Sequence, residues 1–415
     1  MSEPGGRAVD LDKARAATSG IARSWGSFGK EESRLIFFEN GPEGAAALFA
    51  DPVEVLVVDE PSGVGPALAR LDGLRARGLW VAGAIGYEAG LVFEPRLAPL
   101  MPALRDEPLM VFGAFRAPRD PGGFLAGAAA GAAAVRLDPL VPRIDRAGYD
   151  AAFARLKEHL AAGDCYQVNL TFPLDSRLRA GTAPGLYGAL RARQPVGQGA
   201  FLDLGGVVAI SASPELFFDC DAGGRISTRP MKGTAPRDAD PARDRALAQG
   251  LRDSEKVRAE NLMIVDLLRN DIARIARVGS VRVPDLFAVE SYATVHQMVS
   301  RVTGQLAGQP GLAGLVRALF PCGSVTGAPK IRAMQIIAEL ERDPRGLYCG
   351  AMGWMAPDGR AAFNVAIRTL RLFPDGRLRL DVGGGVVQDS TADGEWEEAL
   401  WKTRYARLPG TATCG

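Results

Sequence analysis

The feature that most constrains the fold is the irregular order of strand-like and helix-like segments. Strand-like runs bounded by Gly and Pro occupy residues 34–39, 53–59, 80–87 and 109–117. From residue 145 onward, helical patterns at 145–163, 184–193, 238–276, 311–319, 331–341 and 394–405 are interspersed with strand-like runs that look antiparallel. A doubly wound sheet would need a regular alternation of strand and helix, so we predict an α+β fold.

A low-complexity tract separates two regions of different character. Residues 122–134 read GGFLAGAAAGAAA, which is typical of a linker or a loose edge. We therefore predict a sheet-rich N-terminal lobe at 1–135 and a catalytic region at 136–415, with both packed into one globular unit. Residues up to about 31 show no strong period, and we expect them to be loosely ordered.

Composition narrows the classes of partner. The 415 residues include 49 basic and 48 acidic side chains, a net charge of +1, and no long basic run, which argues against nucleic acid and anionic membranes. There is no signal-like start and no run of membrane-spanning length, so we expect a cytoplasmic protein. Five scattered cysteines without a CxxC motif indicate neither a disulfide framework nor a zinc cluster.

The chain has only two histidines, which leaves little material for a transition-metal site or for a Ser-His-Asp triad. Any metal should therefore be a hard cation bound by carboxylates, which favours Mg²⁺.

One lysine stands out in the stretch TRPMKGTAPR, residues 228–237. Only seven of the 49 cationic residues are Lys, so the chain uses Arg wherever a plain cation suffices. Lys232 lies in an expected Gly/Thr turn, and an amine can lose its proton and attack carbon, which a guanidinium cannot. The alternative is an ordinary surface Lys in a loop.

Two groups of carboxylates suggest a cation site. Glu260 is followed at helical spacing by apolar residues, so it lies on the face that a helix buries, where it needs either a metal or an ion pair such as Arg258. Glu395, Glu398 and Lys402 share one face of the last helix, although a surface pair of Glu398 with Lys402 would also explain their spacing. The preceding Gly383–Gly385 are expected to form a turn whose amides can approach an anion.

Two further positions fit an anionic ligand, and a third fits a general acid. Arg368 interrupts an apolar strand, where it pairs either with a ligand carboxylate or with a buried Asp. Thr326 lies in GSVTGAPK, a loop that lacks the ending of a nucleotide-binding motif, so we reject a nucleoside triphosphate and keep a generic anion cradle. Glu215 enters a strand among apolar residues, which would raise its pKa and suit an acid.

Together these segments resemble the chorismate-utilising enzymes, which comprise anthranilate, aminodeoxychorismate, isochorismate and salicylate synthases. The resemblance covers about residues 145–402, through motifs that include DCYQVNLT, SASPELFF, TRPMKGTAPR, AENLMIVDLLRND, YATVHQMVS, GSVTGAPK, YCGAMGW, FNVAIRTL and EWEEALWK. It implies two α/β halves around a central antiparallel β-sandwich, with chorismate as substrate.

The resemblance also implies roles for single residues. It places Mg²⁺ between a chorismate carboxylate and Glu260 and Glu398, with Glu395 nearby. The groups that would hold the substrate's carboxylates are Arg368, Tyr348, Lys402 and Gly383, Gly384 and Gly385. Thr326, Gly233 and Thr234 would line the pocket, His296 would lie beside the ring, and Glu215 would be the general acid for loss of the C4 hydroxyl.

Position 232 separates the branches of this family. Anthranilate synthases resemble PIAGT there, whereas aminodeoxychorismate synthases resemble PIKGT, and this chain has PMKGT. The Lys that serves as base in isochorismate and salicylate synthases corresponds to Gln167, which disfavours attack by water. In the matching branch Lys232 adds to C2 of chorismate and ammonia then attacks C4, giving 4-amino-4-deoxychorismate, a precursor of p-aminobenzoate and folate.

Ammonia requires a source. No Cys or His of this chain has the context of a class I glutaminase site, so we expect a separate glutamine amidotransferase partner. The alternatives are an anthranilate synthase component I with an unusual Lys and a catalytically silent paralogue that binds chorismate or a partner.

Overall fold

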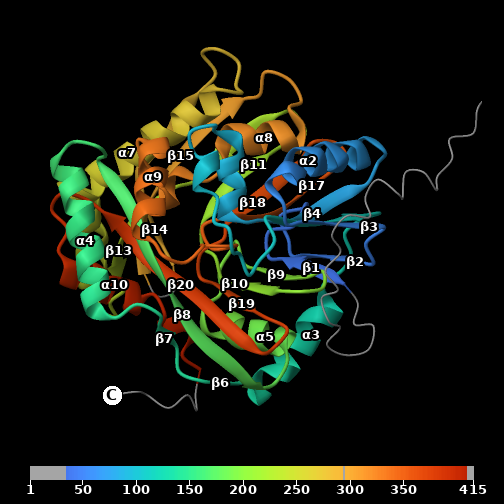
Figure 1. Ribbon diagram of the computed structural model, residues 1–415, viewed down its shortest axis with the longest axis horizontal. Helices are drawn as coiled ribbons and strands as arrows, with labels where there is room; N and C mark the ends of the chain where they lie inside the picture. Colours follow the sequence, from blue (N-terminus) through green and yellow to red (C-terminus); the bar gives the residue numbers. More distant parts are fainter. Residues whose placement is uncertain (1–33, 293–294, 409–415) are drawn as a thin grey trace, which may run out of the picture.

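Two large antiparallel sheets face each other at the centre of the protein. The structure is a computed structural model that describes residues 34–292 and 295–408. Within them each sheet has ten strands, and helices cover the outer faces and the ends (Figure 1). These mixed helices and antiparallel sheets confirm the α+β prediction.

The first sheet runs in the order β16-β8-β20-β19-β10-β9-β1-β2, with β6 and β7 paired to β8. Its strands are β1 (Leu35–Phe38), β2 (Ala47–Ala50), β6 (Arg136–Leu137), β7 (Val141–Pro142), β8 (Gln167–Ala180), β9 (Ala200–Asp203), β10 (Val208–Ser211), β16 (Gly327–Ala328), β19 (Thr369–Leu372) and β20 (Arg377–Val386).

The second sheet runs in the order β13-β15-β12-β11-β18-β17-β4-β5-β3, with β14 paired to β15. Its strands are β3 (Glu54–Val58), β4 (Trp80–Ile85), β5 (Met110–Phe115), β11 (Leu216–Cys220), β12 (Arg225–Thr228), β13 (Met231–Pro236), β14 (Arg282–Ser291), β15 (Val295–Gln305), β17 (Ala351–Met355) and β18 (Ala361–Val365).

Strands from both sides of the predicted boundary at residue 135 share these sheets. In the first sheet β1 pairs with β9, and in the second β4 pairs with β17. A core cluster that includes Phe38, Phe49, Phe115, Leu202 and Trp354 brings together apolar side chains of both sheets. Residues 34–135, called the N-terminal lobe below, are thus bonded into the sheets of the rest of the chain, and the domain boundary itself stays a prediction.

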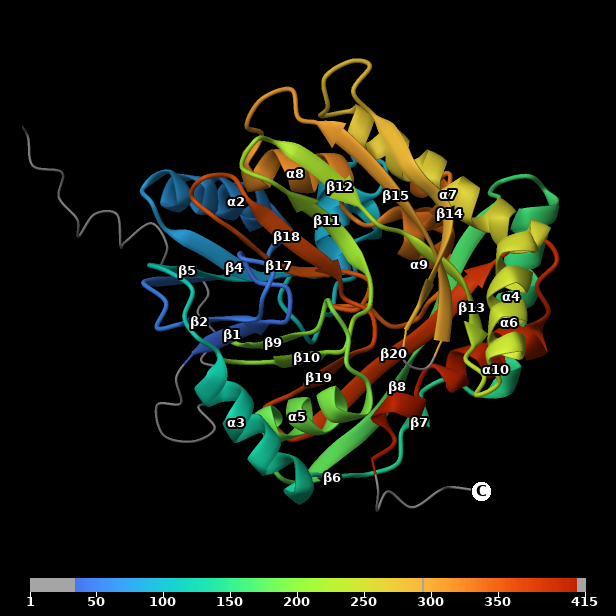
Figure 2. The ribbon, with the colours of Figure 1, turned by 180° about the vertical axis from the view of Figure 1, so that it is seen from behind.

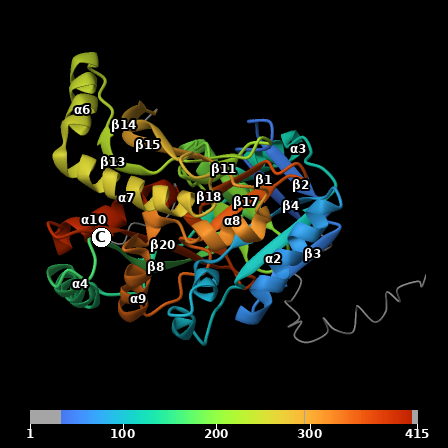
Figure 3. The ribbon, with the colours of Figure 1, turned by 90° about the horizontal axis from the view of Figure 1, so that it is seen from above.

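Nine α-helices lie around the sheets within the described residues: α2 (Pro61–Ala76), α3 (Gly122–Gly131), α4 (Arg146–Ala161), α5 (Ala183–Arg193), α6 (Pro241–Asp253), α7 (Glu255–Ala273), α8 (Gly311–Leu319), α9 (Lys330–Leu340) and α10 (Ala392–Trp401). Short 3₁₀ turns are η1 (Tyr87–Phe93), η2 (Ala98–Leu100), η3 (Ala132–Ala134), η4 (Gly323–Val325) and η5 (Arg404–Ala406). Helices α4, α6, α7 and α10 gather at one end of the molecule, as Figure 3 shows from above. No helix in this part of the chain has the length and hydrophobicity that crossing a membrane requires.

The linker prediction for 122–134 is wrong, because this tract forms α3 and η3. Alanine is the strongest helix former, and glycine lets two helices approach closely. A Cβ on Gly188 of α5 would lie 2.2 Å from the carbonyl oxygen of Ala128 in α3. A Cβ on Gly131 would lie 3.2 Å from Cα of Gly185, so the small residues at 128 and 131 let α3 and α5 pack closely, whereas nothing lies within 4 Å of a Cβ on Gly123 or Gly127.

The single helix expected at 238–276 is also wrong in detail. The chain breaks at Ser254, whose hydroxyl accepts a hydrogen bond from the amide of Val257 at 3.3 Å and so begins α7 as a new helix. The expectation for residues up to about 31 lies outside the described residues.

Candidate active site

The candidate site surrounds the last residues of β20, at the end of the molecule where α7, α10 and β13 come together (Figure 2). Gly383–Gly385 do not form the predicted turn, since they continue β20 and pair with β8 through Val386. Among the described strands β19 pairs with β20 only as far as Leu380, so the other edge of β20 carries no strand beyond that residue. Lys402 Nζ donates to the carbonyl of Gly383 on this edge at 2.6 Å.

The glycines allow functional side chains to approach the backbone of β20. A Cβ on Gly384 would lie 2.6 Å from Glu395 Oε2. A Cβ on Gly385 would lie 2.6 Å from Gln167 Nε2 and 3.3 Å from Lys232 Nζ. Any larger residue at position 384 or 385 would displace these groups. This close approach, and not a turn, explains why both positions are glycine.

Lys232 lies in a bulge of β13 and not in a turn. Met231 pairs with Val299 and Thr234 with Gln297, so Lys232 and Gly233 between them are out of register. Gly233 has a φ of +76°, and its Cβ would come within 2.3 Å of Val257 in α7. The bulge therefore requires glycine beside the lysine.

Thr234 and Gly233 are bound by a neighbouring side chain. Thr234 Oγ1 donates to Gln297 Oε1 at 2.8 Å, and Gln297 Nε2 donates to the carbonyl of Gly233 at 2.7 Å. Thr234 is exposed, so it lies at the surface beside Lys232.

The charges of Lys232 and Glu215 influence each other, and both side chains have shifted pKa values. Burial lowers the pKa of Lys232, and the charges of Glu215 and Glu260 only partly oppose this. Burial raises the pKa of Glu215, which is 6% exposed, and Ser324, Lys232 and Arg368 offset the rise only in part. Glu215 Oε1 has no hydrogen-bond partner within the described chain. This pair can therefore supply a neutral amine and a protonated acid nearer to neutral pH than either residue does in water.

The three predicted metal ligands influence one another's charge. Burial raises the pKa of Glu260, and Glu398 raises it further against the opposing lysines 232 and 256. Burial also raises the pKa of Glu395, which accepts a hydrogen bond from Ser390 Oγ at 2.7 Å. Partial desolvation of Glu398 is outweighed by its pairing with Lys402 at 2.8 Å, which keeps the pKa of Glu398 low. The Glu398 side chain is 58% exposed, so this is the surface pair that the spacing also predicted.

These carboxylates fit Mg²⁺ in chemistry. Glu260 forms no ion pair with Arg258 or any other cation in the described chain, and a divalent ion would relieve the repulsion among the three acids. Nowhere in residues 34–292 and 295–408 do three His, Cys, Asp or Glu side chains already converge as a metal site. Oxygen ligands from a substrate carboxylate would therefore have to complete the coordination.

Arg368 is a buried cation without a carboxylate partner among the described residues. It lies between β18 and β19 with a φ of +50°, and no carboxylate of the described residues pairs with it, so the predicted alternative of a buried Arg–Asp pair is wrong. Burial lowers its pKa, while Tyr405 and Glu215 oppose the change. Such a desolvated guanidinium would bind a carboxylate strongly.

Tyr348 and Thr326 are deeply buried near these segments. Tyr348 precedes Cys349, whose amide donates to the carbonyl of Ala366 at 3.0 Å, two residues before Arg368. Thr326 is fully buried, and its carbonyl accepts from the amide of Asn169, the residue opposite Gly385.

His296 is not brought to this cluster. Its Nδ1 lies 2.7 Å from Ser291 Oγ and its Nε2 lies 2.9 Å from Asp244 Oδ1. The imidazole therefore joins β14 and α6, and its predicted position beside a substrate ring stays a prediction.

Sequence reasoning missed three residues of this environment. Lys256 precedes Glu260 by four residues on α7, a spacing that could have indicated their interaction. Ser324 bonds to Glu215, and the buried Tyr405, whose hydroxyl has no partner among the described residues, lies near Arg368. Neither of these two has a sequence signal, because each meets its neighbour only through the fold.

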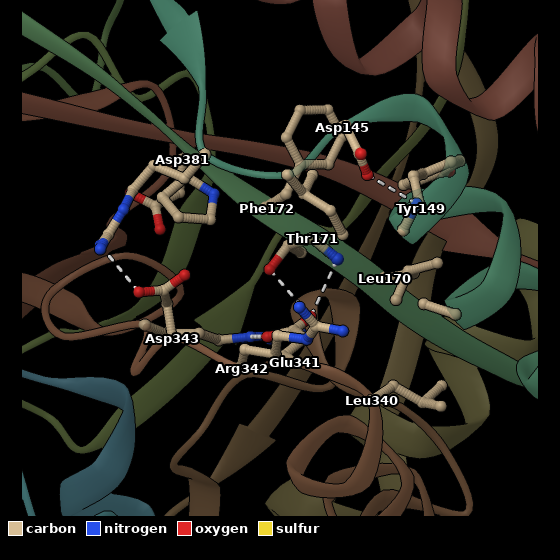
Figure 4. Close-up of a pocket in the computed structure, with 16 residues that line it drawn as sticks. Asp145, Tyr149, Leu170, Thr171, Phe172, Leu340, Glu341, Arg342, Asp343 and Asp381 are labelled. Atoms are coloured by element: carbon tan, nitrogen blue, oxygen red, sulfur yellow. Dashed lines mark hydrogen bonds and ion pairs between the residues drawn. The ribbon is translucent and has the colours of Figure 1, made fainter.

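A separate cavity of about 340 Å³ opens between α4, β8 and the end of α9 (Figure 4). Charged residues such as Arg143, Glu341 and Asp343 line it together with Tyr149 and Phe172, and none of the predicted site residues does. The candidate site is thus defined by its cluster of side chains and not by this cavity.

The chain is similar to proteins of one known family. Residues 128–407 match the chorismate binding enzyme family. Aminodeoxychorismate synthase of Streptomyces griseus is 46% identical over 278 residues, which cover 67% of this chain and 38% of that protein. Aminodeoxychorismate synthase component 1 of Escherichia coli K12 is 44% identical over 257 residues, covering 62% and 56% of the two chains.

Other branches of the family are also similar. Anthranilate synthase component 1 of Streptomyces coelicolor is 44% identical over 262 residues, covering 63% of this chain and 51% of that protein. The crystal structure of anthranilate synthase component I from Streptococcus pneumoniae TIGR4 has the same fold, with a TM-score of 0.73, 23% identity, and coverage of 98% of this chain and 100% of that one.

The matched region spans between about a third and somewhat over half of the length of the curated relatives. It nevertheless includes every residue of the cluster around β20. The chain belongs to the family of chorismate binding enzymes.

Proposed function

We propose that the chain converts chorismate and ammonia into 4-amino-4-deoxychorismate. The observation that carries this proposal is the position of Lys232, a partly buried amine with a lowered pKa next to the protonatable Glu215 and the backbone of Gly385. The names of the relatives from Streptomyces griseus and Escherichia coli support it.

In the proposed reaction Lys232 Nζ attacks C2 of chorismate as the C4 hydroxyl leaves. The hydroxyl takes the proton of Glu215 and departs as water, and the amine nitrogen, once bonded to carbon, gives up a proton to the Glu215 carboxylate, which restores the acid. Ammonia then attacks C4 and expels Lys232 from C2, which restores the free lysine. Gln167, which is fully buried beside Gly385, offers no base to activate water for a competing addition.

Binding would rest on charge. Arg368, Lys402 and the open edge of β20 are the groups proposed to hold the two carboxylates of chorismate. Glu260 and Glu398 would hold Mg²⁺ together with a substrate carboxylate, with Glu395 close by. The ion would neutralise the substrate's charge and help to orient it.

A separate glutamine amidotransferase is proposed as the source of ammonia. The designation of relatives as component 1 supports a two-part enzyme. The cytoplasmic location expected from the sequence stays part of the proposal.

The test is product analysis. The protein is incubated with chorismate, MgCl₂ and ammonium, and the product is identified by mass and by conversion to p-aminobenzoate with aminodeoxychorismate lyase. Anthranilate formed without the lyase would instead establish the second candidate, anthranilate synthase, which the equal similarity of the Streptomyces coelicolor protein keeps open.

A further inference from the structure

The loop that carries Tyr348 is held by two carboxylates of the N-terminal lobe. Glu88 Oε1 and Oε2 accept the amides of Arg345 at 2.7 Å and Gly346 at 3.1 Å. Glu107 Oε2 accepts the next amide, that of Leu347, at 3.1 Å. Three consecutive amides are thus bonded to side chains more than 200 positions away in sequence.

The carbonyls of the same loop are also fixed. Arg371 donates to the carbonyl of Arg345 at 2.5 Å and to Glu107 Oε1 at 2.6 Å, and the amide of Tyr87 donates to the carbonyl of Gly346 at 2.7 Å. Gly346 has a φ of +60°, and a Cβ there would lie 2.4 Å from Glu107 Oε1. The loop therefore has one conformation that satisfies these bonds.

The Arg345 side chain joins the loop to other segments of the site. Its guanidinium donates to the carbonyls of Asn169 at 2.7 Å and Val325 at 2.9 Å, and it pairs with Glu341 at 2.7 Å. Glu341 in turn accepts the amide and hydroxyl of Thr171, as Figure 4 shows. Asn169 lies opposite Gly385 and Val325 precedes Thr326, so displacement of Arg345 would disturb both.

Backbone bonds connect this loop directly to the candidate site. Ala366 exchanges bonds with Cys349 and Gly350 at 3.0 and 2.9 Å, and the amide of Val365 donates to the carbonyl of Glu215 at 3.0 Å. Arg368 follows Ala366 by two residues in the sequence. A shift of the loop would therefore move the guanidinium and the acid of the proposed reaction.

The charges in this contact are expensive to bury. Glu88 is 4% exposed, and the side chains of Glu107 and Arg371 are 7% and 0% exposed. The buried ion pair of Glu107 with Arg371 adds little net stability compared with apolar packing, so its presence favours a role in fixing one geometry.

We propose that Glu88 and Glu107 are positioning residues that fix loop 345–350 so that Tyr348 and Arg368 hold the carboxylates of the substrate. This inference rests on the proposed function, because it assigns the two carboxylates to the same site. Neither residue touches the reacting atoms, and both act through the loop backbone.

The experiment compares Glu88→Gln and Glu107→Gln with Glu39→Gln. Glu39 is a matched control, since it is a largely buried lobe carboxylate that binds Tyr187 at 2.7 Å and Arg191 at 2.6 Å but not the loop. We expect kcat/KM for chorismate to fall about 10- to 100-fold in the two loop variants, mainly through KM. Amide exchange of residues 345–350 should accelerate in these variants, while Glu39→Gln should change neither quantity.

The outcomes separate the two proposals. Wild-type kinetics in variants whose loop amides exchange faster would overturn the positioning role, and so would an equal rise in KM in Glu39→Gln. A wild-type protein that forms no product contradicts the proposed function alone, and the Kd of chorismate measured by calorimetry then decides the positioning role by the same comparison. If Glu88→Gln does not fold, Glu107→Gln is used alone, because its side-chain oxygen can still accept the hydrogen bond from the amide of Leu347.

Discussion

Replacing Gly385 with alanine should impair catalysis without unfolding the protein. The new Cβ would lie 2.6 Å from Gln167 Nε2, whereas ordinary contacts begin at 3.4 Å, so the amide must retreat by 3.4 − 2.6, or about 0.8 Å. Lys232 Nζ, at 3.3 Å, would be pressed as well. Both obstacles are ends of flexible side chains, which can move.

The magnitude follows from this displacement. A misplacement of about 1 Å costs on the order of 10²-fold in rate, or about 2.7 kcal/mol of transition-state stabilisation, even where the displaced group, here Gln167, takes no part in the chemistry. We therefore expect kcat/KM for chorismate to fall about 100-fold at saturating ammonium. The melting temperature should change little, because no backbone has to move.

Two other glycines provide the controls. A Cβ on Gly383 would lie 2.2 Å from the backbone oxygen of Leu170, so Gly383→Ala should fold poorly. Gly250 on α6 has nothing within 4 Å of its Cβ, and Gly250→Ala should stabilise the protein by about 0.5–1 kcal/mol at unchanged activity. A folded Gly385→Ala protein with kcat/KM within twofold of wild type would refute this account of the site.

Four further predictions address the proposed chemistry. Lys232→Met should abolish the covalent route and raise the free energy of unfolding at pH 7 by about 0.5–2 kcal/mol. Burial lowers the pKa of Lys232, so the charged amine destabilises the folded state below that pKa. Thermal melts should show that the gain in stability of the variant vanishes as the pH approaches 10.5, the ordinary pKa of Lys. Glu215→Gln should lower kcat by about 10²- to 10⁴-fold; the wild-type rate should decline as pH rises through the raised pKa of Glu215, and the variant should lack this limb of the pH profile. Arg368→Lys should raise KM for chorismate about tenfold or more, since a charge-assisted bond contributes about 1.5–3 kcal/mol, with kcat much less affected. EDTA should suppress turnover, and Glu260→Gln should raise the MgCl₂ concentration for half-maximal activity, whereas equal activity without divalent ions would contradict the assigned ligands.

Local signals in the sequence predict most helices and strands correctly. Asp145, which caps α4 by accepting the amide of Gly148 at 2.8 Å, marks the start of that helix, and α8 was predicted at its observed bounds of 311–319. Such features depend on neighbours in sequence, and a single chain contains them. They extend to Glu395, Glu398 and Lys402, whose shared helix face follows from spacing alone.

Glycines were harder to interpret because they serve two purposes. Gly383–Gly385 and the 122–134 tract were both read as irregular, since glycine favours turns. In the structure glycine lets another group approach a strand or helix closely, and the group that approaches comes from a distant segment. These close contacts can be recognised only in the folded structure, where β8, α5 and α10 lie next to the glycines.

The contact between Glu88 and the loop at Arg345 is beyond sequence reasoning for the same reason. The partners are 257 positions apart, and no sequence motif around either residue indicates their contact. Buried ionic groups also break the rule that charged residues are exposed, so composition and periodicity place them on the surface.

Some of the buried polar atoms without a partner in the described chain lie in the candidate site, and others, such as those of Tyr87 and Arg371, lie elsewhere. Gln167 is fully buried, yet neither its amide nitrogen nor its oxygen has a partner within the described chain, and Glu215 and Tyr405 each bury an unpartnered oxygen. Each such group costs about 1–3 kcal/mol, which a fold selected for stability alone would avoid. Gln167 and Glu215 both neighbour Lys232, and Tyr405 neighbours Arg368, which has no carboxylate partner there. The unpaired groups around β20 therefore favour an arrangement completed by a bound, multiply charged substrate.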